Sequence, residues 1–192
     1  MRVTKLLYFC MVCAVFILSC ASVTRKEIYV NLTDSSKFVL LPTEGIEQDM
    51  DMAQFLSAKF RGKDYFFNGW VKANKDEIEM VFFNELGTNL GEISYKNGAV
   101  RFSSAVIPKS AVKYIKPEYV IADFQLCFYD PFLLGESLKD IGLVWETNEG
   151  SRRILNRNEV IIEINKTKNT VELINHLQGY TYTLEGDFDG TL

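Results

Sequence analysis

A few residues have side chains that could support catalysis, and the chain supplies few partners for them. Ser110 to Lys113 match the S-x-x-K pattern of serine acyltransferases, but the companion motifs of that class are missing. His176, the single histidine, could activate a serine, yet the chain has no Gly-x-Ser-x-Gly turn. We therefore expect no catalytic residues and no enzyme activity, with a serine acyl hydrolase as the less favoured alternative.

Metal ligands are equally sparse. A zinc site at His176 would need several carboxylates, which is an uncommon ligand set. Asp187 to Gly190 begin like a calcium loop but lack its closing glutamate. Cys10 and Cys13 form a C-x-x-C pair inside an apolar N-terminal run, where that spacing carries no redox meaning. We expect no metal site and no cofactor.

Aromatic residues make up 13% of the chain. They are compatible with an ordinary core, or with a cavity that takes an acyl chain or another elongated apolar ligand. Val120, Phe124 and Phe128 are spaced four apart, which places them along one side of a helix. The candidate cavity residues are Trp70, Phe82, Val120, Phe124, Phe128 and Trp145.

The N-terminal segment has the features of a secretory signal. Arg2 and Lys5 precede an unbroken apolar run from 6 to 18, which is too short to span a bilayer comfortably. The run ends in Ile17-Leu18-Ser19-Cys20, which resembles a bacterial lipobox. That resemblance implies cleavage after residue 19 and diacylation of Cys20. Ala21 lacks the inner-membrane retention signal of an Asp at this position, which favours the outer membrane, with the folded domain in the periplasm.

Charge and cysteine usage support the same interpretation. Cleavage and lipidation would leave Cys127 alone, so we expect no disulfide framework in the mature chain. The formal net charge is -4, and nucleic acid is not an expected partner because a phosphate-binding surface needs clustered basic residues. Loss of Arg2 and Lys5 makes the mature chain more acidic, so the lipid must hold it to the membrane.

Beyond the signal, the chain alternates apolar and polar residues with the period of a β-strand. Ile78, Met80 and Phe82 share one face of such a segment. Further alternating segments lie at 93–96, 100–103, 143–146, 159–164 and 180–184. Asn97-Gly98 is a strong hairpin signal, and such short connections make neighbouring strands antiparallel.

Two segments depart from this alternation. Residues 45–58 are interpreted as a short helix. Residues 117–138 begin with Pro117 and are apolar nearly all round as far as Phe128, which indicates a buried helix. We predict a signal peptide at 1–19, a lipidated N-terminus and tether at 20–36, and a single half-barrel domain at 37–192. The expected fold is α+β, with a strongly curved antiparallel sheet of roughly 9 to 11 strands that forms an unclosed β-barrel around a helical plug or lid.

The order of these segments resembles a family of uncharacterised bacterial outer-membrane lipoproteins, often encoded beside aryl-polyene or fatty-acid-like synthesis genes. That family is related to the lipoprotein receptor and carrier fold of the Lol system. The segments that carry the resemblance are Leu86 to Tyr95 with Asn97-Gly98, Ile121 to Leu126, Arg153 to Leu155 before Val160 to Ile162, and Asn175 before Gly179-Tyr180.

The resemblance implies an unclosed barrel with a helical lid over an apolar cavity. It also implies non-enzymatic binding or transport of a lipid, an acylated polypeptide or another hydrophobic ligand. No residue matches the exposed hydrophobic loop of the Lol receptor, so receptor activity is not carried over. A structural module for envelope assembly is the alternative. The sequence leaves open the ligand's identity and the oligomeric state.

Overall fold

One large antiparallel sheet organises the chain. The computed structural model describes residues 27–60, 62–108 and 116–188. The predicted signal peptide, Cys20 and the Ser110–Lys113 motif lie outside these residues. The first half contains β1 (Tyr29–Asn31), β2 (Lys37–Val39), η1 (Thr43–Gly45), β3 (Met50–Phe60), β4 (Lys63–Ala73), β5 (Glu77–Phe83), β6 (Asn89–Lys96) and β7 (Ala99–Ser103). The second half contains α3 (Pro117–Phe128), α4 (Pro131–Asp140), β8 (Val144–Asn148), β9 (Ser151–Asn156), β10 (Glu159–Lys166), β11 (Thr170–Asn175) and β12 (Tyr180–Glu185).

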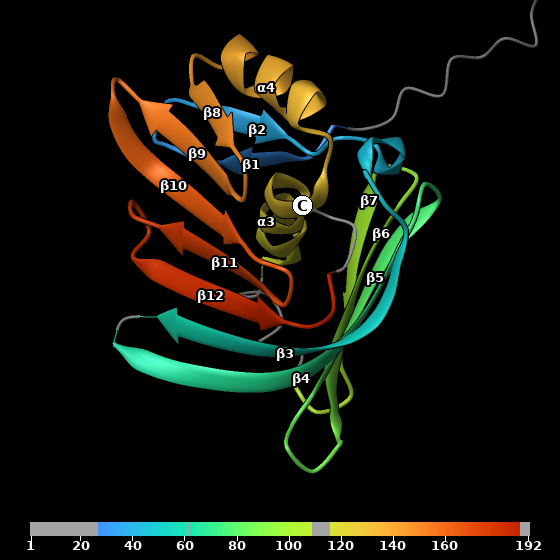
Figure 1. The fold of residues 1–192 in the computed structure, drawn as a ribbon. Helices are drawn as coiled ribbons and strands as arrows, with labels where there is room; N and C mark the ends of the chain where they lie inside the picture. Colours follow the sequence, from blue (N-terminus) through green and yellow to red (C-terminus); the bar gives the residue numbers. More distant parts are fainter. Residues whose placement is uncertain (1–26, 61, 109–115, 189–192) are drawn as a thin grey trace, which may run out of the picture.

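Ten of these strands form a sheet in the order β7-β6-β5-β4-β3-β12-β11-β10-β9-β8, and β1 and β2 form a separate pair. The sheet curves strongly around α3 (Figure 1). It does not close, because β7 and β8 are its two edges and do not pair with each other. The prediction of a large, unclosed antiparallel sheet is confirmed.

Tight turns explain why neighbouring strands in the sequence are neighbours in the sheet. Asn97 and Gly98 between β6 and β7 have φ values of 53° and 73°, as the type I′ hairpin predicted from the sequence requires. Arg157 and Asn158 between β9 and β10 also have positive φ, at 50° and 70°. The pairing of β3 with β12 is the one join in this sheet between strands far apart in the sequence.

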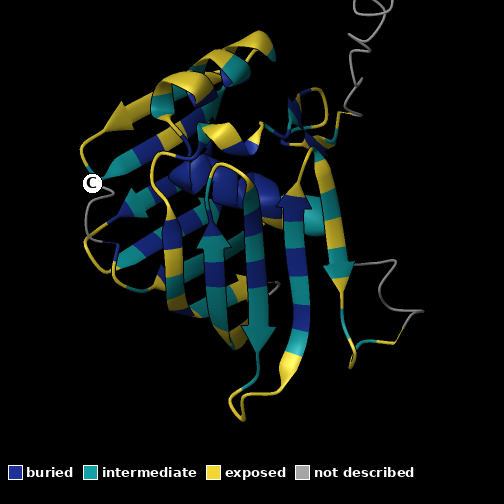
Figure 2. Cartoon of the chain, turned by 90° about the vertical axis from the view of Figure 1, so that its right-hand side faces the viewer, coloured by how far each residue is buried: buried dark blue, intermediate teal, exposed yellow. Residues whose placement is uncertain are grey.

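Helix α3 lies on the concave side of the sheet and is buried along most of its length (Figures 1 and 2). Pro117 occupies its first turn, where the missing N–H would have no helical partner. Every residue from Ile121 to Phe128 is buried, and α3 packs against β1, β7 and β11. The apolar composition of this segment follows from contact on all sides.

The predicted helical segment at 117–138 is two helices. The Asp130 side chain accepts a hydrogen bond of 2.9 Å from the Leu133 N–H, and Pro131 begins α4. This N-cap starts a second helix directly after α3. Helix α4 buries Leu134 and Leu138 and packs against β8 and β2, while Phe132 is 78% exposed.

Two boundaries predicted from the sequence are wrong. Residues 45–58 are not a helix, because η1 ends at Gly45 and β3 begins at Met50. Along β3, Asp51 and Phe55 are exposed and Gln54 is buried, which is the alternation of a strand. The folded body also begins inside the predicted tether, since β1 starts at Tyr29 and Val30 is buried.

Candidate functional site

An apolar cavity of about 440 Å³ lies between α3 and the strands β3 to β7 and β12. Figure 2 shows strands extending beyond the buried helix, with half-buried and exposed residues toward their ends. The cavity is lined by Gln54, Leu56, Ala58, Phe67, Gly69, Trp70, Val71, Met80, Val81, Phe82, Leu90, Gly91, Ile93, Phe102, Ile107, Val120, Asp123, Phe124, Tyr182 and Leu184. Its volume falls within the range of small-molecule sites, about 300–1,000 Å³.

Two glycines on neighbouring strands make room for this cavity. Gly69 of β4 and Gly91 of β6 both pair with Phe82 of the intervening β5. A Cβ atom at Gly69 would meet only backbone carbonyl oxygens, at 3.6 and 3.8 Å. A Cβ atom at Gly91 would come within 2.9 Å of the Phe102 ring. The missing side chain at Gly69 therefore leaves open space, and the one at Gly91 leaves room for the Phe102 ring.

Helix α3 contributes one face to the cavity wall. Val120, Asp123 and Phe124 line it, and their i, i+3 and i+4 spacing places them together on the helix surface. Phe124 is buried, and its ring centroid lies 4.8 Å from that of Phe128.

Asp123 is the buried carboxyl of this wall, and its partner comes from β12. The Tyr180 hydroxyl donates a hydrogen bond of 2.8 Å to Asp123 Oδ2, and Asn175 Nδ2 donates one of 3.3 Å to the Tyr180 oxygen. Burial raises the pKa of Asp123 to about 7, and the hydrogen bond from Tyr180 opposes this rise in part. Burial also raises the pKa of the neighbouring Cys127 thiol to about 11 and the pKa of Tyr182 well above its ordinary value.

The structure brings together part of the predicted cavity set. Phe82, Val120 and Phe124 line the cavity, and Trp70 is also part of its wall. The register places Trp70 opposite Val81 and on the other face of β4 from Val71, so the Trp70 side chain lies on the opposite face of the sheet. Trp70 is half-buried.

Phe128 and Trp145 do not line the cavity, and these two assignments are corrected. Phe128 packs against Phe124 and against Phe188, whose ring centroid is 5.8 Å away. Trp145 is half-buried and lies against α4, where a Cβ atom at Gly135 would come within 3.2 Å of its ring.

Sequence reasoning missed Asp123 and both glycines. The i+3 position from Val120 was the signal for Asp123, because helical neighbours alternate steps of three and four. Nothing local marks Gly69 or Gly91, since their effect depends on Phe82 in the strand between them.

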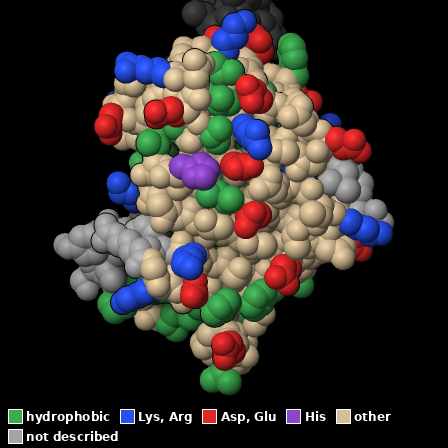
Figure 3. All heavy atoms as spheres, turned by 60° about the vertical axis from the view of Figure 1, so that its left-hand side comes forward, with side chains coloured by type: hydrophobic (Ala, Val, Ile, Leu, Met, Phe, Trp, Pro, Cys, Tyr) green, Lys and Arg blue, Asp and Glu red, His purple; other side chains and the backbone are tan. Residues whose placement is uncertain are grey.

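His176 lies on the outer surface, with its side chain 47% exposed and Nε2 3.9 Å from Glu163 Oε2. Acidic and basic side chains are scattered over this face without a cluster of one sign (Figure 3). Within the described parts of the chain, no group of three His, Cys, Asp or Glu side chains could hold a metal ion. None of the helices in the described residues has the length and apolar character needed to cross a membrane.

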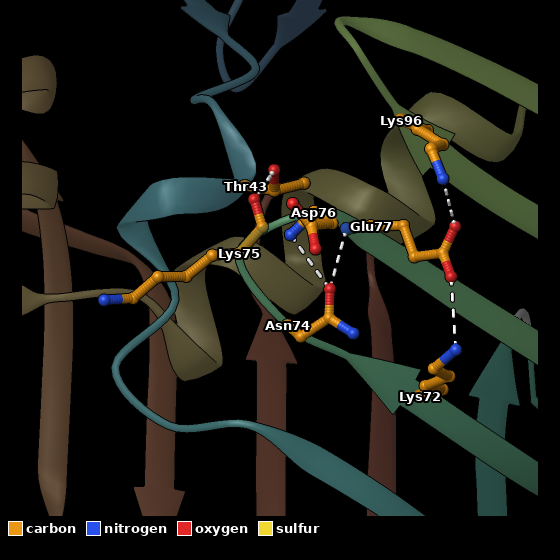
Figure 4. Close-up of polar contacts among 7 residues, drawn as sticks. All are labelled: Thr43, Lys72, Asn74, Lys75, Asp76, Glu77 and Lys96. Carbon is orange, nitrogen blue, oxygen red and sulfur yellow. Dashed lines mark hydrogen bonds and ion pairs between the residues drawn. The ribbon is translucent and has the colours of Figure 1, made fainter.

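The charged cluster at the β4–β5 turn has a structural explanation (Figure 4). Glu77 pairs with Lys96 at 2.9 Å and with Lys72 at 3.2 Å, and these ammonium groups hold the pKa of its carboxyl below the ordinary value. Asn74 Oδ1 accepts hydrogen bonds from the backbone N–H groups two and three residues later. Thr43 Oγ1 donates a hydrogen bond of 2.6 Å to a carbonyl of the same turn, which ties η1 to the sheet.

The fold and the cavity define a class of protein: a curved, unclosed antiparallel sheet with two helices and an apolar cavity on its concave side. Residues 51–186 match the family described as "Protein of unknown function (DUF3261)". This match covers most of the chain, and the protein belongs to that family. No curated protein matches the chain.

Proposed function

We propose that the protein binds and carries an elongated hydrophobic molecule, a lipid or an acylated polypeptide, without catalysing a reaction on it. The observation that carries this proposal is the cavity of about 440 Å³ beside Gly69, with its apolar strand lining. Ordinary cores are packed closely and leave few voids larger than a water molecule. A volume of this size on the concave face therefore supports a binding role.

The unclosed sheet suits this task. An apolar chain can enter beside α3 while the strands keep their backbone hydrogen bonds, so that α3 acts as the lid of a lipoprotein-carrier-like half-barrel. Val120, 37% exposed, lies where the wall of the cavity meets the helix surface.

The lipobox resemblance at Cys20 supports a location in the bacterial cell envelope. A diacylated Cys20 would anchor the chain in the outer membrane, with the folded domain in the periplasm and within reach of lipids. The proposed partners are the membrane, through this anchor, and the hydrophobic ligand.

The decisive experiment fills the cavity without removing a core contact. Gly69→Leu places a side chain in the open space of the cavity, whereas Asn68→Leu places the same side chain at the exposed neighbouring position on the other face of β4. The chain from residue 21 onward retains every described residue and has no lipid of its own to compete. Binding of the neutral fluorescent probe diphenylhexatriene and lipid co-purification are measured for all three proteins.

We expect Gly69→Leu to keep the melting temperature within a few degrees and to reduce probe binding at least about tenfold. Asn68→Leu should leave probe binding unchanged. If nothing co-purifies and no probe binds the unsubstituted chain, the structural envelope-assembly role replaces the carrier role. Hydrolysis of an ester probe that is lost in Ser110→Ala would instead establish the acyl hydrolase.

A further inference from the structure

Among the residues that the structure describes, Asp123 is the single acidic or basic one in the lining of the cavity. Burying a carboxyl group is costly unless it is hydrogen-bonded, and an apolar residue would fill the same position on α3 at no such cost. Oδ2 accepts the hydrogen bond from Tyr180. Within the part of the chain that the structure describes, no side chain or backbone group donates to Oδ1. This oxygen is therefore available to a ligand.

The pair of Asp123 and Tyr180 has the geometry of a positioned acceptor. Asn175 donates to the Tyr180 oxygen, and Tyr180 donates to Asp123, so a chain of two hydrogen bonds fixes the carboxyl group from β11 and β12. The neighbouring lining is apolar, with Val120 and Phe124 on either side of Asp123 on the same helix face. The polar group of a ligand bound here would contact Asp123 Oδ1, and the rest of the ligand would contact apolar side chains.

We propose that Asp123 recognises the polar end of the ligand, and that the cavity selects single-chain molecules whose head group is a hydrogen-bond donor or a cation, such as an alcohol or an amine, over chains that end in a carboxylate. This inference rests on the proposed carrier function. The inference excludes free fatty acids as preferred ligands, because a fatty acid would place a second carboxylate beside Asp123 and the two negative charges would repel each other.

The charges around Asp123 agree with this selectivity. Its pKa of about 7 leaves most of the carboxyl ionised at pH 8. Cys127, Tyr180 and Tyr182 face it from α3 and β12, and each has a raised pKa that keeps it uncharged at that pH. On the strands packed against α3, β7 carries the exposed Arg101, and β11 carries Glu172, which accepts a hydrogen bond from Asn165. Among the described residues no cation pairs with Asp123, so a ligand head group there meets one negative charge that only the Tyr180 hydroxyl contacts.

The test compares chain-matched probes on the chain from residue 21 onward at pH 8. Displacement of diphenylhexatriene is measured with dodecylamine, dodecan-1-ol and dodecanoate, each below its micelle concentration. We expect dodecylamine to bind at least about tenfold more tightly than dodecanoate, as one hydrogen bond to a charged group allows. Asp123→Asn keeps the shape of the side chain and removes its charge, so this preference should collapse. Asp64→Asn, the same change at an exposed position of β4, should preserve it.

Failure of the inference is distinguishable from failure of the carrier function. Dodecanoate binding as tightly as dodecylamine in the unsubstituted chain would overturn the inference and leave the carrier function standing. An Asp123→Asn variant with an unchanged ranking would do the same. If none of the three molecules displaces the probe and the probe itself does not bind, both proposals fall. The ranking in the unsubstituted chain decides the matter even if Asp123→Asn does not fold.

Discussion

At the scale of single residues, Arg152 shows how a buried charge can hold a helix in place. Its Nη1 donates hydrogen bonds to the carbonyls of Leu126, Cys127 and Tyr129, at 3.2, 3.0 and 3.0 Å. Its Nη2 pairs with Glu47 at 3.1 Å. The last carbonyls of a helix have no partner within the helix and carry partial negative charge, which a guanidinium can satisfy. Arg152 of β9 thus fixes the end of α3 to the sheet.

We expect Arg152→Met to lower the free energy of unfolding by about 3–5 kcal/mol, because three buried carbonyls and Glu47 lose their donor. The matched control is Arg153→Met. Arg153 is the next residue on the strand, faces solvent and pairs with Glu163, so its loss should change stability by less than about 1 kcal/mol. Urea unfolding of both variants measures the difference. Equal effects would show that the three hydrogen bonds contribute nothing beyond an ordinary surface pair.

Asp123 predicts a dependence of stability on pH. Its pKa in the folded protein is about 7, above the ordinary value of 3.8. Between these values the unfolded chain releases the proton and the folded protein keeps it, so the free energy of unfolding falls as pH rises from about 4 to 7. Each unit of raised pKa corresponds to about 1.4 kcal/mol. The stability of Asp123→Asn relative to the unsubstituted protein should rise over this range, and parallel stability curves would contradict the assignment.

At the scale of elements, the properties visible in a short window were predictable and those set by distant partners were not. The buried helix α3 and the hairpin at Asn97-Gly98 were both predicted, because each is indicated by residues that are neighbours in the sequence. The apolar residues within 50–60 are compatible with the periodicity of a helix or of a strand. Pairing with β4 and β12 determines that this segment is a strand. The volume at Gly69 likewise depends on strands that no local pattern identifies.

The error at Phe128 has a geometric cause. A helix turns about 100° per residue, so positions four apart drift by about 40° at each step. Val120 and Phe124 remain on the cavity side, while Phe128 has rotated toward Phe188. Residues spaced strictly four apart therefore rotate away from the cavity wall along the helix. Asp123, three residues after Val120, remains on the side of the helix that lines the cavity.

This difference predicts opposite behaviour for two phenylalanines of one helix. Phe128→Ala should lower the free energy of unfolding by about 3–5 kcal/mol, as at a closely packed site, without changing binding of diphenylhexatriene. Phe124→Ala should cost less, because one side of its ring already faces the cavity, and it should weaken probe binding. Thermal melting and probe titration of both variants separate the two roles. A larger stability loss at Phe124 with binding unchanged would place that residue in the ordinary core.

At the scale of the whole molecule, the β3–β12 pair joins two runs of strands into one sheet. Strands β3 to β7 form the side that lines most of the cavity, and β8 to β12 form the side that holds the end of α3 through Arg152. The two edge strands, β7 and β8, do not pair with each other. The sheet can therefore hold α3 on one side and keep a cavity open on the other.

The lipobox resemblance at Cys20 predicts where this molecule resides. The proposed carrier function requires a firm membrane anchor, and each buried methylene of an acyl chain contributes about 0.8 kcal/mol. We expect mass spectrometry of the mature protein to find its N-terminus at Cys20 with diacylglycerol attached, and membrane separation to place it in the outer membrane. Cys20→Ser should leave the precursor unprocessed, and Ala21→Asp should move the mature protein to the inner membrane. A mature chain that keeps Met1, or an unmodified Cys20, would refute the anchor while leaving the cavity and its ligand selectivity to be tested on their own terms.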